Sequence, residues 1–419
     1  MAAAEAVTAA LEGVSSPLFA VANRAVDAAP RPVKEWAIET FGAADKAVLV
    51  GGVVATVAIL AFLAGAVGAV QPGPAVTAFV GLSAVAAAAV TTDRAATASP
   101  ALRLVPVVAL VVTGLAGLLL LLRTLRPDPA PTVEGHTPTG PVLEPGSVET
   151  LELGKPRLLL PPHVPGDDLP AEFDRRAFLK AAAAVGAVAA AGGVSSRVLG
   201  GPAAAASRLG VSVPVPDAAA PALTEGMTLD VPGITPYLTS NREFYRVDTA
   251  LRVPDVPVDT WRLRVHGLVD RELDLSFEDL LSRRLVERRI TLTCVSNPVG
   301  GEYVGNATWI GVPVRDLLRE AGVRGGADAV KSTSADDFTV GTPLSALLDD
   351  ARDAVLAIAM NGEPLPLEHG FPVRMVTPGL YGYVSATKWL VDLEVTRFAD
   401  FEAYWTTRGY AAQAPIKTS

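Results

Sequence analysis

The chain is poor in the side chains that most metal and redox sites need. Its 419 residues include one cysteine, Cys294, and four histidines, at positions 136, 163, 266 and 369. A single thiol excludes an intrachain disulfide, a zinc site built from cysteines, a cysteine-ligated iron–sulfur cluster and the C-x-x-C-H attachment of a c-type haem. No histidine falls in a run apolar enough to cross a membrane, which also excludes a haem held by two histidines between membrane helices.

Basic charge and aromatic side chains are scarce as well. The chain has 35 Lys and Arg against 44 Asp and Glu, and from residue 223 onward 20 basic residues face 27 acidic ones. Nucleic acid is therefore not an expected partner, because neutralising phosphates needs a basic surface. Aromatic residues make up 6% of a chain that is 50% hydrophobic. The surplus is aliphatic, as in membrane spans, which disfavours a wholly soluble enzyme.

Three uncharged runs before residue 123 are candidate membrane helices. Residues 47–70 give 24 positions without a charge, enough at about 1.5 Å per residue to cross roughly 30 Å of hydrocarbon. Residues 74–92 and 104–122 give 19 positions each, and the first of these is Ala-rich enough to suit a re-entrant helix instead. We predict about three transmembrane helices within 47–122, after an N-terminal segment, 1–46, that holds at most a partial extra span.

A Pro-rich linker over 123–173 leads into Asp174-Arg-Arg-Ala-Phe-Leu-Lys180. This order, followed by the uncharged run 181–196, is typical of a twin-arginine export signal. An arginine pair beside an ordinary membrane helix is the alternative. Because that export pathway moves folded proteins, a cofactor could be inserted before export. We expect 174–207 to be a signal helix that is retained as a last anchor, although Ala204 and Ala206 also resemble a cleavage site.

Two rules disagree about the side of the membrane on which the N-terminus lies. An arginine pair that begins in the cytoplasm, preceded by three spans, puts the N-terminus outside. The positive-inside rule would instead keep the four basic residues of segment 1–46 inside. A further span within 2–22 would resolve the parity, but Glu5 and Glu12 oppose it.

Residues 222–419 are patterned as a mixed α and β globular domain. Apolar and polar residues alternate over 261–266, and Ile290, Leu292 and Cys294 share one strand face, so that the cysteine lies at the strand exit. Ser276 to Asp279 is predicted to cap a short helix, and Pro313 to open another that Gly322 ends. Further strands are predicted over 355–360, 372–376 and 387–395.

The lone thiol has three possible roles when its own sequence neighbourhood is considered. It could be a small buried hydrophobe, which is the usual place of a free cysteine. It could be a nucleophile, but no acid or base stands with it in a recognisable motif. It could be one thiolate ligand to a soft metal whose remaining ligands come from a cofactor.

Several long motifs around Cys294 resemble one family. They are Thr291-Leu-Thr-Cys-Val-Ser-Asn297, Trp309-Ile-Gly-Val-Pro313 and the stretch from Leu356 to Gly382 that continues to Thr387-Lys-Trp-Leu390. In this order they resemble the molybdopterin domain of the sulfite oxidase family, over roughly residues 236–410. The resemblance implies an N-terminal α-helical membrane region followed by an α+β domain of the sulfite oxidase molybdopterin-binding fold.

The resemblance also implies a cofactor, Mo-molybdopterin, and a set of residues around it. Cys294 carries over as the molybdenum ligand and therefore as the catalytic residue. The cofactor-binding residues implied by the family motifs are Asn241, Tyr245, Arg246, Ser334, His369, Arg374, Ser385, Thr387 and Lys388. Arginine and lysine suit the phosphate of the cofactor, whereas hydroxyl, amide and imidazole groups suit the pterin edges.

The function that follows is oxygen-atom transfer on a small sulfur or related substrate. We expect an extracytoplasmic catalytic domain on a multi-pass bacterial membrane protein, with electrons exchanged with an external cytochrome or quinone-linked carrier. Reduction of methionine sulfoxide or another S-oxide is the alternative to sulfite oxidation, because residues 295–301 supply no cation for an anionic substrate. The alternative from another class of protein is an exported binding domain without catalytic activity. Such a domain would be expected to have lost Cys294, which is present here.

Overall fold

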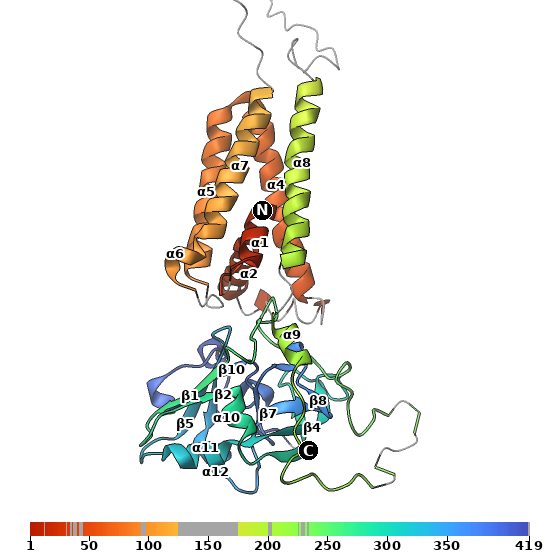
Figure 1. Ribbon diagram of the computed structural model, residues 1–419, viewed down its shortest axis with the longest axis vertical. Coiled ribbons are helices and arrows are strands. Elements are labelled where there is room, and N and C mark those ends of the chain that lie inside the picture. Colours follow the sequence, from red (N-terminus) through yellow and green to blue (C-terminus); the bar gives the residue numbers. More distant parts are fainter. Residues whose placement is uncertain are drawn as a thin grey trace, which may run out of the picture.

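The computed structural model describes residues 1–124, 175–199 and 203–417, apart from short gaps at 12, 31, 34–35, 37–39, 42–44, 94–97, 225, 228–230 and 233. A bundle of helices comes first in the chain, and a compact domain of sheets and short helices lies beyond one end of that bundle (Figure 1). The predicted linker, 123–173, falls almost wholly outside the described residues.

Among the described residues, four helices of the bundle are long and apolar enough to cross a membrane. The bundle's principal helices are α4 (Asp45–Val70), α5 (Pro72–Thr91), α7 (Val105–Thr124) and α8 (Arg175–Leu199), with the short α6 (Pro100–Arg103) leading into α7. Large apolar side chains such as Phe62, Leu63 and Val112 are exposed on them. An apolar helix exposed on this scale needs a hydrocarbon surrounding, which supports a multi-pass membrane protein. The Ala-rich run is part of α5, a full-length helix.

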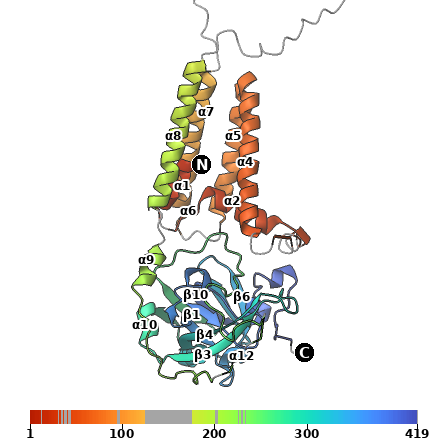
Figure 2. The same cartoon turned by 90° about the vertical axis from the view of Figure 1, so that its right-hand side faces the viewer.

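Two shorter helices near the start of the chain, α1 (Ala2–Ala9) and α2 (Pro17–Ala28), are described before the spans. They have 8 and 12 residues, and each is too short to cross the bilayer alone. Ser16 caps α2 through a bond from the Leu18 amide, 3.2 Å long, and Pro17 fits the first turn because its missing N–H would have no partner there. Figure 2 shows α1 beside α8 and α2 at the end of the bundle that faces the domain.

The domain is built on two five-stranded sheets. The first has the order β2 (Leu273–Ser276), β1 (Arg262–Gly267), β10 (Leu390–Thr396), β5 (Ala329–Ser334) and β6 (Thr339–Pro343). The second has the order β3 (Val286–Thr293), β4 (Val304–Pro313), β7 (Val355–Met360) and β8 (Glu363–Pro364), with β9 (Arg374–Val376) also paired to β7. Only the pair of β1 and β10 is parallel among the pairs of named strands.

Short helices lie before, between and after the strands of the domain. They are α9 (Ala203–Leu209), α10 (Phe277–Leu281), α11 (Val314–Ala321), α12 (Leu344–Leu348) and the 3₁₀ turns η2 (Leu367–His369), η3 (Gly382–Val384), η4 (Phe398–Asp400) and η5 (Thr406–Arg408). The predicted capping of α10 is confirmed, since Ser276 and Asp279 bond each other's backbone amides. Gly322, at φ 71°, ends α11 as predicted.

Strand β7 is the centre of the domain because both of its faces are buried. Leu356 and Ile358 pack into the larger apolar core with β1, β10 and α11, whereas Val355 and Ala357 pack into a second core with Trp309. Successive strand residues point to opposite faces, so a strand without polar positions, such as Val-Leu-Ala-Ile-Ala-Met, belongs between two cores. The candidate site lies beside the second core.

The predicted strand over 387–395 begins later than expected. Strand β10 starts at Leu390 because Trp389 has a φ of 47°, which is incompatible with a strand. The three residues before β10 therefore form a loop against β9, where the Met375 amide bonds the Thr387 carbonyl at 2.9 Å. This break in the strand places Lys388 in the site.

Candidate functional site

Cys294 lies directly after β3, at the strand exit that its spacing predicted. Its amide donates to the Tyr303 carbonyl at 2.9 Å, which ties the exit of β3 to the beginning of β4. Its thiol is half-buried and lies 3.5 Å from the Ser296 hydroxyl. Leu292, one strand period earlier, is buried in the second core. The thiol is therefore held at a fixed place while one side remains accessible to a ligand.

Tyr245 lies close enough to both Cys294 and Arg374 for their charges to act on its hydroxyl. Its ring stacks on Phe244, with the centroids 5.3 Å apart. Burial raises the pKa of the Tyr245 hydroxyl; the negative charge of the nearby Cys294 thiolate raises it too, and the charge of Arg374 acts in the opposite direction. The phenol therefore stays protonated and can donate a hydrogen bond.

His369 is buried, with 2% of its surface exposed, and its tautomer follows from its partner. Its Nε2 lies 2.8 Å from the Asn241 carbonyl. A carbonyl only accepts, so Nε2 carries the proton and Nδ1 presents a lone pair. Burial lowers the pKa of the imidazole to about 4, which keeps the ring neutral around pH 7. Among the described residues, Nδ1 has no hydrogen-bond partner.

Arg374, the first residue of β9, is also buried. One terminal nitrogen donates to the His369 carbonyl at 3.0 Å, and the guanidinium lies over the Trp309 ring, 5.1 Å from its centroid. Burial lowers the pKa of the guanidinium to about 10, so it remains charged near pH 7. Its Nε donor has no partner in the described part of the chain.

Gly370 allows these groups to approach one another. Its φ is +109°, and a Cβ at this position would lie 3.0 Å from the Cβ of Arg374 and from the Cα of Lys388. A side chain at residue 370 would therefore be strained and would push the two cations apart.

Lys388 is part of a cluster of charges around one carboxylate. Its ammonium donates to Asp248 at 2.8 Å and to the Glu368 carbonyl at 3.0 Å, and Arg246 donates to the same carboxylate at 2.9 Å. We call Lys46, Arg246, Asp248 and Lys388 the Asp248 cluster. Burial lowers the pKa of Lys388 to about 8. Burial also opposes ionisation of Asp248, but the charges of Lys388, Lys46 and Arg246 outweigh it and hold the pKa of this carboxyl well below its usual range.

The three predicted hydroxyl residues are buried, and two of them bond to protein groups. Ser385 donates to the carbonyls of Leu380 and Tyr381 at 3.1 and 3.0 Å, and the Thr387 hydroxyl lies 2.6 Å from that of Ser332. Ser334, the last residue of β5, is 1% exposed. The hydroxyls of Ser385 and Thr387 thus hold the loop that carries Lys388.

Two polar residues of the site escaped the sequence analysis. Asp248 follows Arg246 by two positions, but no motif in the sequence indicates that a carboxylate belongs among the expected phosphate-binding groups. Asn361, the residue after β7, donates to the Asn241 side chain at 2.8 Å and accepts from the Thr308 amide at 2.9 Å. It fixes the orientation of Asn241. Its φ of 51° suits asparagine in a tight turn.

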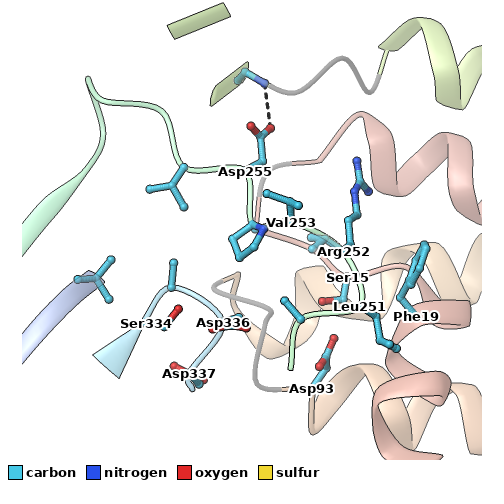
Figure 3. Close-up of a pocket in the computed structure, with 18 of the residues that line it drawn as sticks. Ser15, Phe19, Asp93, Leu251, Arg252, Val253, Asp255, Ser334, Asp336 and Asp337 are labelled. Carbon is cyan, nitrogen blue, oxygen red and sulfur yellow. Dashed lines mark hydrogen bonds between the residues drawn. The ribbon is translucent and has the colours of Figure 1, made fainter. Parts of the chain in front are cut away.

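The large cavity at the boundary between bundle and domain is a separate feature. It measures about 1490 Å³ and is lined from the bundle by Ser15, Phe19 and Asp93 and from the domain by residues such as Leu251 and Asp336 (Figure 3). Of the ten predicted site residues, only Ser334 lines it. The groups around Cys294, Arg374 and Lys388 lie outside this cavity.

The residues around Cys294 fit a molybdopterin. The Nδ1 acceptor of His369 and the Nε donor of Arg374 are buried without partners among the described residues, and an unpaired buried group costs about 1–3 kcal/mol. An acceptor and a donor together suit a pterin edge, which carries both kinds of group. No three His, Cys, Asp or Glu side chains of the described part gather as a metal site. A metal at Cys294 would therefore need ligands from a cofactor.

The fold and this set of residues define a molybdopterin-binding domain, and comparisons with known proteins agree. The model of the family described as "Oxidoreductase molybdopterin binding domain" matches residues 250–405. The uncharacterized oxidoreductase YuiH of Bacillus subtilis is 38% identical over 164 residues, which cover 38% of this chain and 79% of that protein.

Two better-known enzymes are also similar to the domain. Nitrate reductase [NAD(P)H] of Hordeum vulgare is 35% identical over 181 residues, covering 37% of this chain and 20% of the enzyme. Mitochondrial sulfite oxidase of Rattus norvegicus is 32% identical over 204 residues, covering 43% of this chain and 36% of the enzyme. The chain thus spans only a minor part of these two relatives. It belongs to the sulfite oxidase family of molybdopterin-dependent oxidoreductases.

Proposed function

We propose that this chain is a membrane-anchored molybdenum oxidoreductase that transfers an oxygen atom to or from a small sulfur compound. The observation that carries the proposal is a pair of buried atoms without hydrogen-bond partners in the described part of the chain, His369 Nδ1 and Arg374 Nε, in a domain that also holds the single, half-buried thiol. When bound, the molybdenum cofactor supplies two-electron oxygen-atom transfer between Mo(VI) and Mo(IV).

Each of the candidate site residues has a distinct part in holding that cofactor. Cys294 provides the thiolate ligand to molybdenum. Hydrogen bonds to the pterin come from Asn241, Tyr245, His369 and Arg374. Ser334, the last residue of β5, offers its hydroxyl to a polar edge of the pterin. Lys388 and Arg246 provide positive charge for the phosphate, while Ser385 and Thr387 position Lys388.

The surroundings of Cys294 favour a neutral substrate. Residues 295–301 contain no Lys or Arg, and Val295, Val299 and Val304, which follow the thiol in the sequence, are exposed. Arg246, a candidate cation for an anionic substrate, donates to Asp248. An anion such as sulfite would lose hydration here without a cation to replace it. Reduction of a neutral S-oxide, such as that of methionine, is therefore the second candidate function and the direction that this feature supports.

The arrangement of the helices supports a domain outside the cytoplasm. Helix α8 begins with the arginine pair at the end of the bundle far from the domain and ends next to it (Figure 1). If the pair lies in the cytoplasm, as the twin-arginine signal requires, the domain lies on the other side of the membrane. Electrons would then be exchanged with a separate cytochrome or quinone-linked protein.

Metal and pterin analysis of the full-length protein tests the cofactor assignment. The protein purified from a host that makes molybdopterin should hold close to one molybdenum and one pterin per chain. Cys294→Ser should keep the fold but lose turnover, whereas Ser296→Ala, which removes the neighbour of the thiol, should retain turnover. Wild-type protein without molybdenum and pterin would overturn the proposal and favour a non-catalytic binding domain.

A panel of substrates tests the direction of the reaction. Sulfite, methionine sulfoxide and other S- and N-oxides are assayed with an artificial electron dye as donor or acceptor. Turnover of the neutral S-oxide, with little response to sulfite, is expected. Efficient sulfite oxidation with no S-oxide reduction would contradict the second candidate and leave the first.

A further inference from the structure

A lysine from the first long membrane helix reaches into the predicted phosphate end of the cofactor site. Lys46 is the second residue of α4 and precedes the span that begins at Val48. Its ammonium bonds the Asp248 carboxylate and donates to the Ala250 carbonyl at 2.9 Å. Some 200 positions separate these residues in the sequence, so the contact joins the bundle to the domain.

The Asp248 cluster has more positive than negative charge. Lys46, Arg246 and Lys388 all contact one carboxylate, and 7% of the Asp248 side chain and 8% of the Lys388 side chain are exposed. Within this cluster of described side chains, three cations and one carboxylate leave an excess of two positive charges. Lys388 is the buried cation of the three, and a buried cation is costly unless it is paired. A doubly charged phosphate would balance this excess.

We propose that Lys46 is part of the subsite for the cofactor phosphate, together with Arg246 and Lys388, and that cofactor binding fastens the domain to the membrane bundle. This inference rests on the proposed function, which places the phosphate at Lys388. Lys46 then has two roles: a structural partner of Asp248 in the protein without cofactor, and a phosphate contact in the protein with cofactor.

Thermodynamic linkage makes the two roles separable. If docking of α4 supplies a charge to the phosphate site, cofactor binding and docking must strengthen each other by the same factor. A second ion pair, Arg408 with Asp27 of α2 at 3.4 Å, also joins bundle and domain but lies outside the Asp248 cluster. Loss of that pair should weaken docking without removing a charge from the phosphate site.

The experiment compares four full-length proteins in detergent, each prepared with and without cofactor from hosts that make or lack molybdopterin. They are wild type, Lys46→Met, Lys46→Arg and Lys331→Met. Lys331 is the matched control, because it forms a partly exposed ion pair with Glu394 at 3.2 Å within the domain. Two quantities are measured: the half-time of pterin loss after dilution, and the rise in melting temperature that the cofactor causes.

We expect Lys46→Met to release the pterin about tenfold faster than wild type, as loss of a charge-assisted contact implies. The melting-temperature rise caused by the cofactor should shrink in the same variant. Lys46→Arg keeps the charge and should behave like wild type, and so should Lys331→Met.

Two results would overturn the inference, and they are distinguishable. If Lys46→Met lowers the melting temperature equally with and without cofactor and holds pterin as long as wild type, Lys46 is a structural contact only, while the proposed function stands. If wild-type protein binds no molybdopterin at all, the proposed function falls and the inference falls with it.

Discussion

At the scale of single residues, the burial of His369 makes stability depend on pH. Its pKa lies near 4 in the folded chain, against about 6.5 for an exposed imidazole. Between these values the unfolded chain binds the proton and the folded chain does not. Stability is therefore lost as pH falls from about 6.5 toward 4. The penalty at pH 4.5 is on the order of 2 kcal/mol for this residue.

The measurement is the melting temperature of wild type and His369→Gln at pH 7 and pH 4.5. Carboxyl groups also titrate in this range, but they do so in both proteins. The difference between the two slopes of melting temperature against pH therefore isolates the contribution of His369. Wild type should lose more stability on acidification than the variant. Equal slopes would mean that His369 is not held neutral by burial.

Asp248 offers a second prediction at this scale. Asp248→Asn leaves three cations without their shared carboxylate, and breaking a buried ion pair in this way costs about 3–5 kcal/mol. The loss of melting temperature should be largest in the protein without cofactor. Asp274→Asn removes a carboxylate that pairs with Arg262 on the surface, both side chains being more than half exposed, and should change stability by less than about 1 kcal/mol. Comparable losses in both variants would contradict a special role for the cluster.

At the scale of elements, the contact between β4 and β7 depends on Gly311. The pairing of these strands shifts register between Ile310 and Gly311, and a Cβ at residue 311 would lie 2.0 Å from the Leu356 carbonyl oxygen. Gly311→Ala should therefore separate the strands and cost about 1–3 kcal/mol. Strand β9, which contains Arg374, also pairs with β7. The pterin content of the variant should therefore fall together with its stability.

Gly325→Ala is the matched control for this prediction, because a Cβ there meets no atom within 4 Å. Melting temperature and pterin content of both variants are measured in the full-length protein. A Gly311→Ala protein as stable as Gly325→Ala would show that the two strands can move apart without cost.

The elements also show which parts of the structure the sequence can predict. Strand β1, the capped helix α10, helix α11 and the buried strand β7 follow from local periodicity and capping residues, and the structure confirms them. The start of β10 does not follow, since Trp389 adopts a positive φ for tertiary reasons. The resemblance to a family implied ten site residues. It could not imply the contact between Asp248 and Lys46, because these residues lie some 200 positions apart and no local sequence pattern predicts such a contact.

At the scale of the whole molecule, the proposed twin-arginine signal predicts that the path of the chain through the membrane depends on the arginine pair at the start of α8. The double change Arg175→Lys with Arg176→Lys keeps both charges, so the positive-inside preference is unaltered. A twin-arginine receptor, by contrast, reads the arginines themselves. We expect the variant to leave the domain in the cytoplasm, where protease added to spheroplasts cannot reach it, whereas the wild-type domain is digested.

Arg123→Lys is the control, because Arg123 lies in the last turn of α7, at the same end of the bundle as the arginine pair (Figure 1). The control protein should be digested like wild type. If the double variant is digested as well, charge alone orients α8 and the pair is not an export signal. If the wild-type domain is itself protected, the catalytic domain lies inside the cell, and its electron carrier must be sought there.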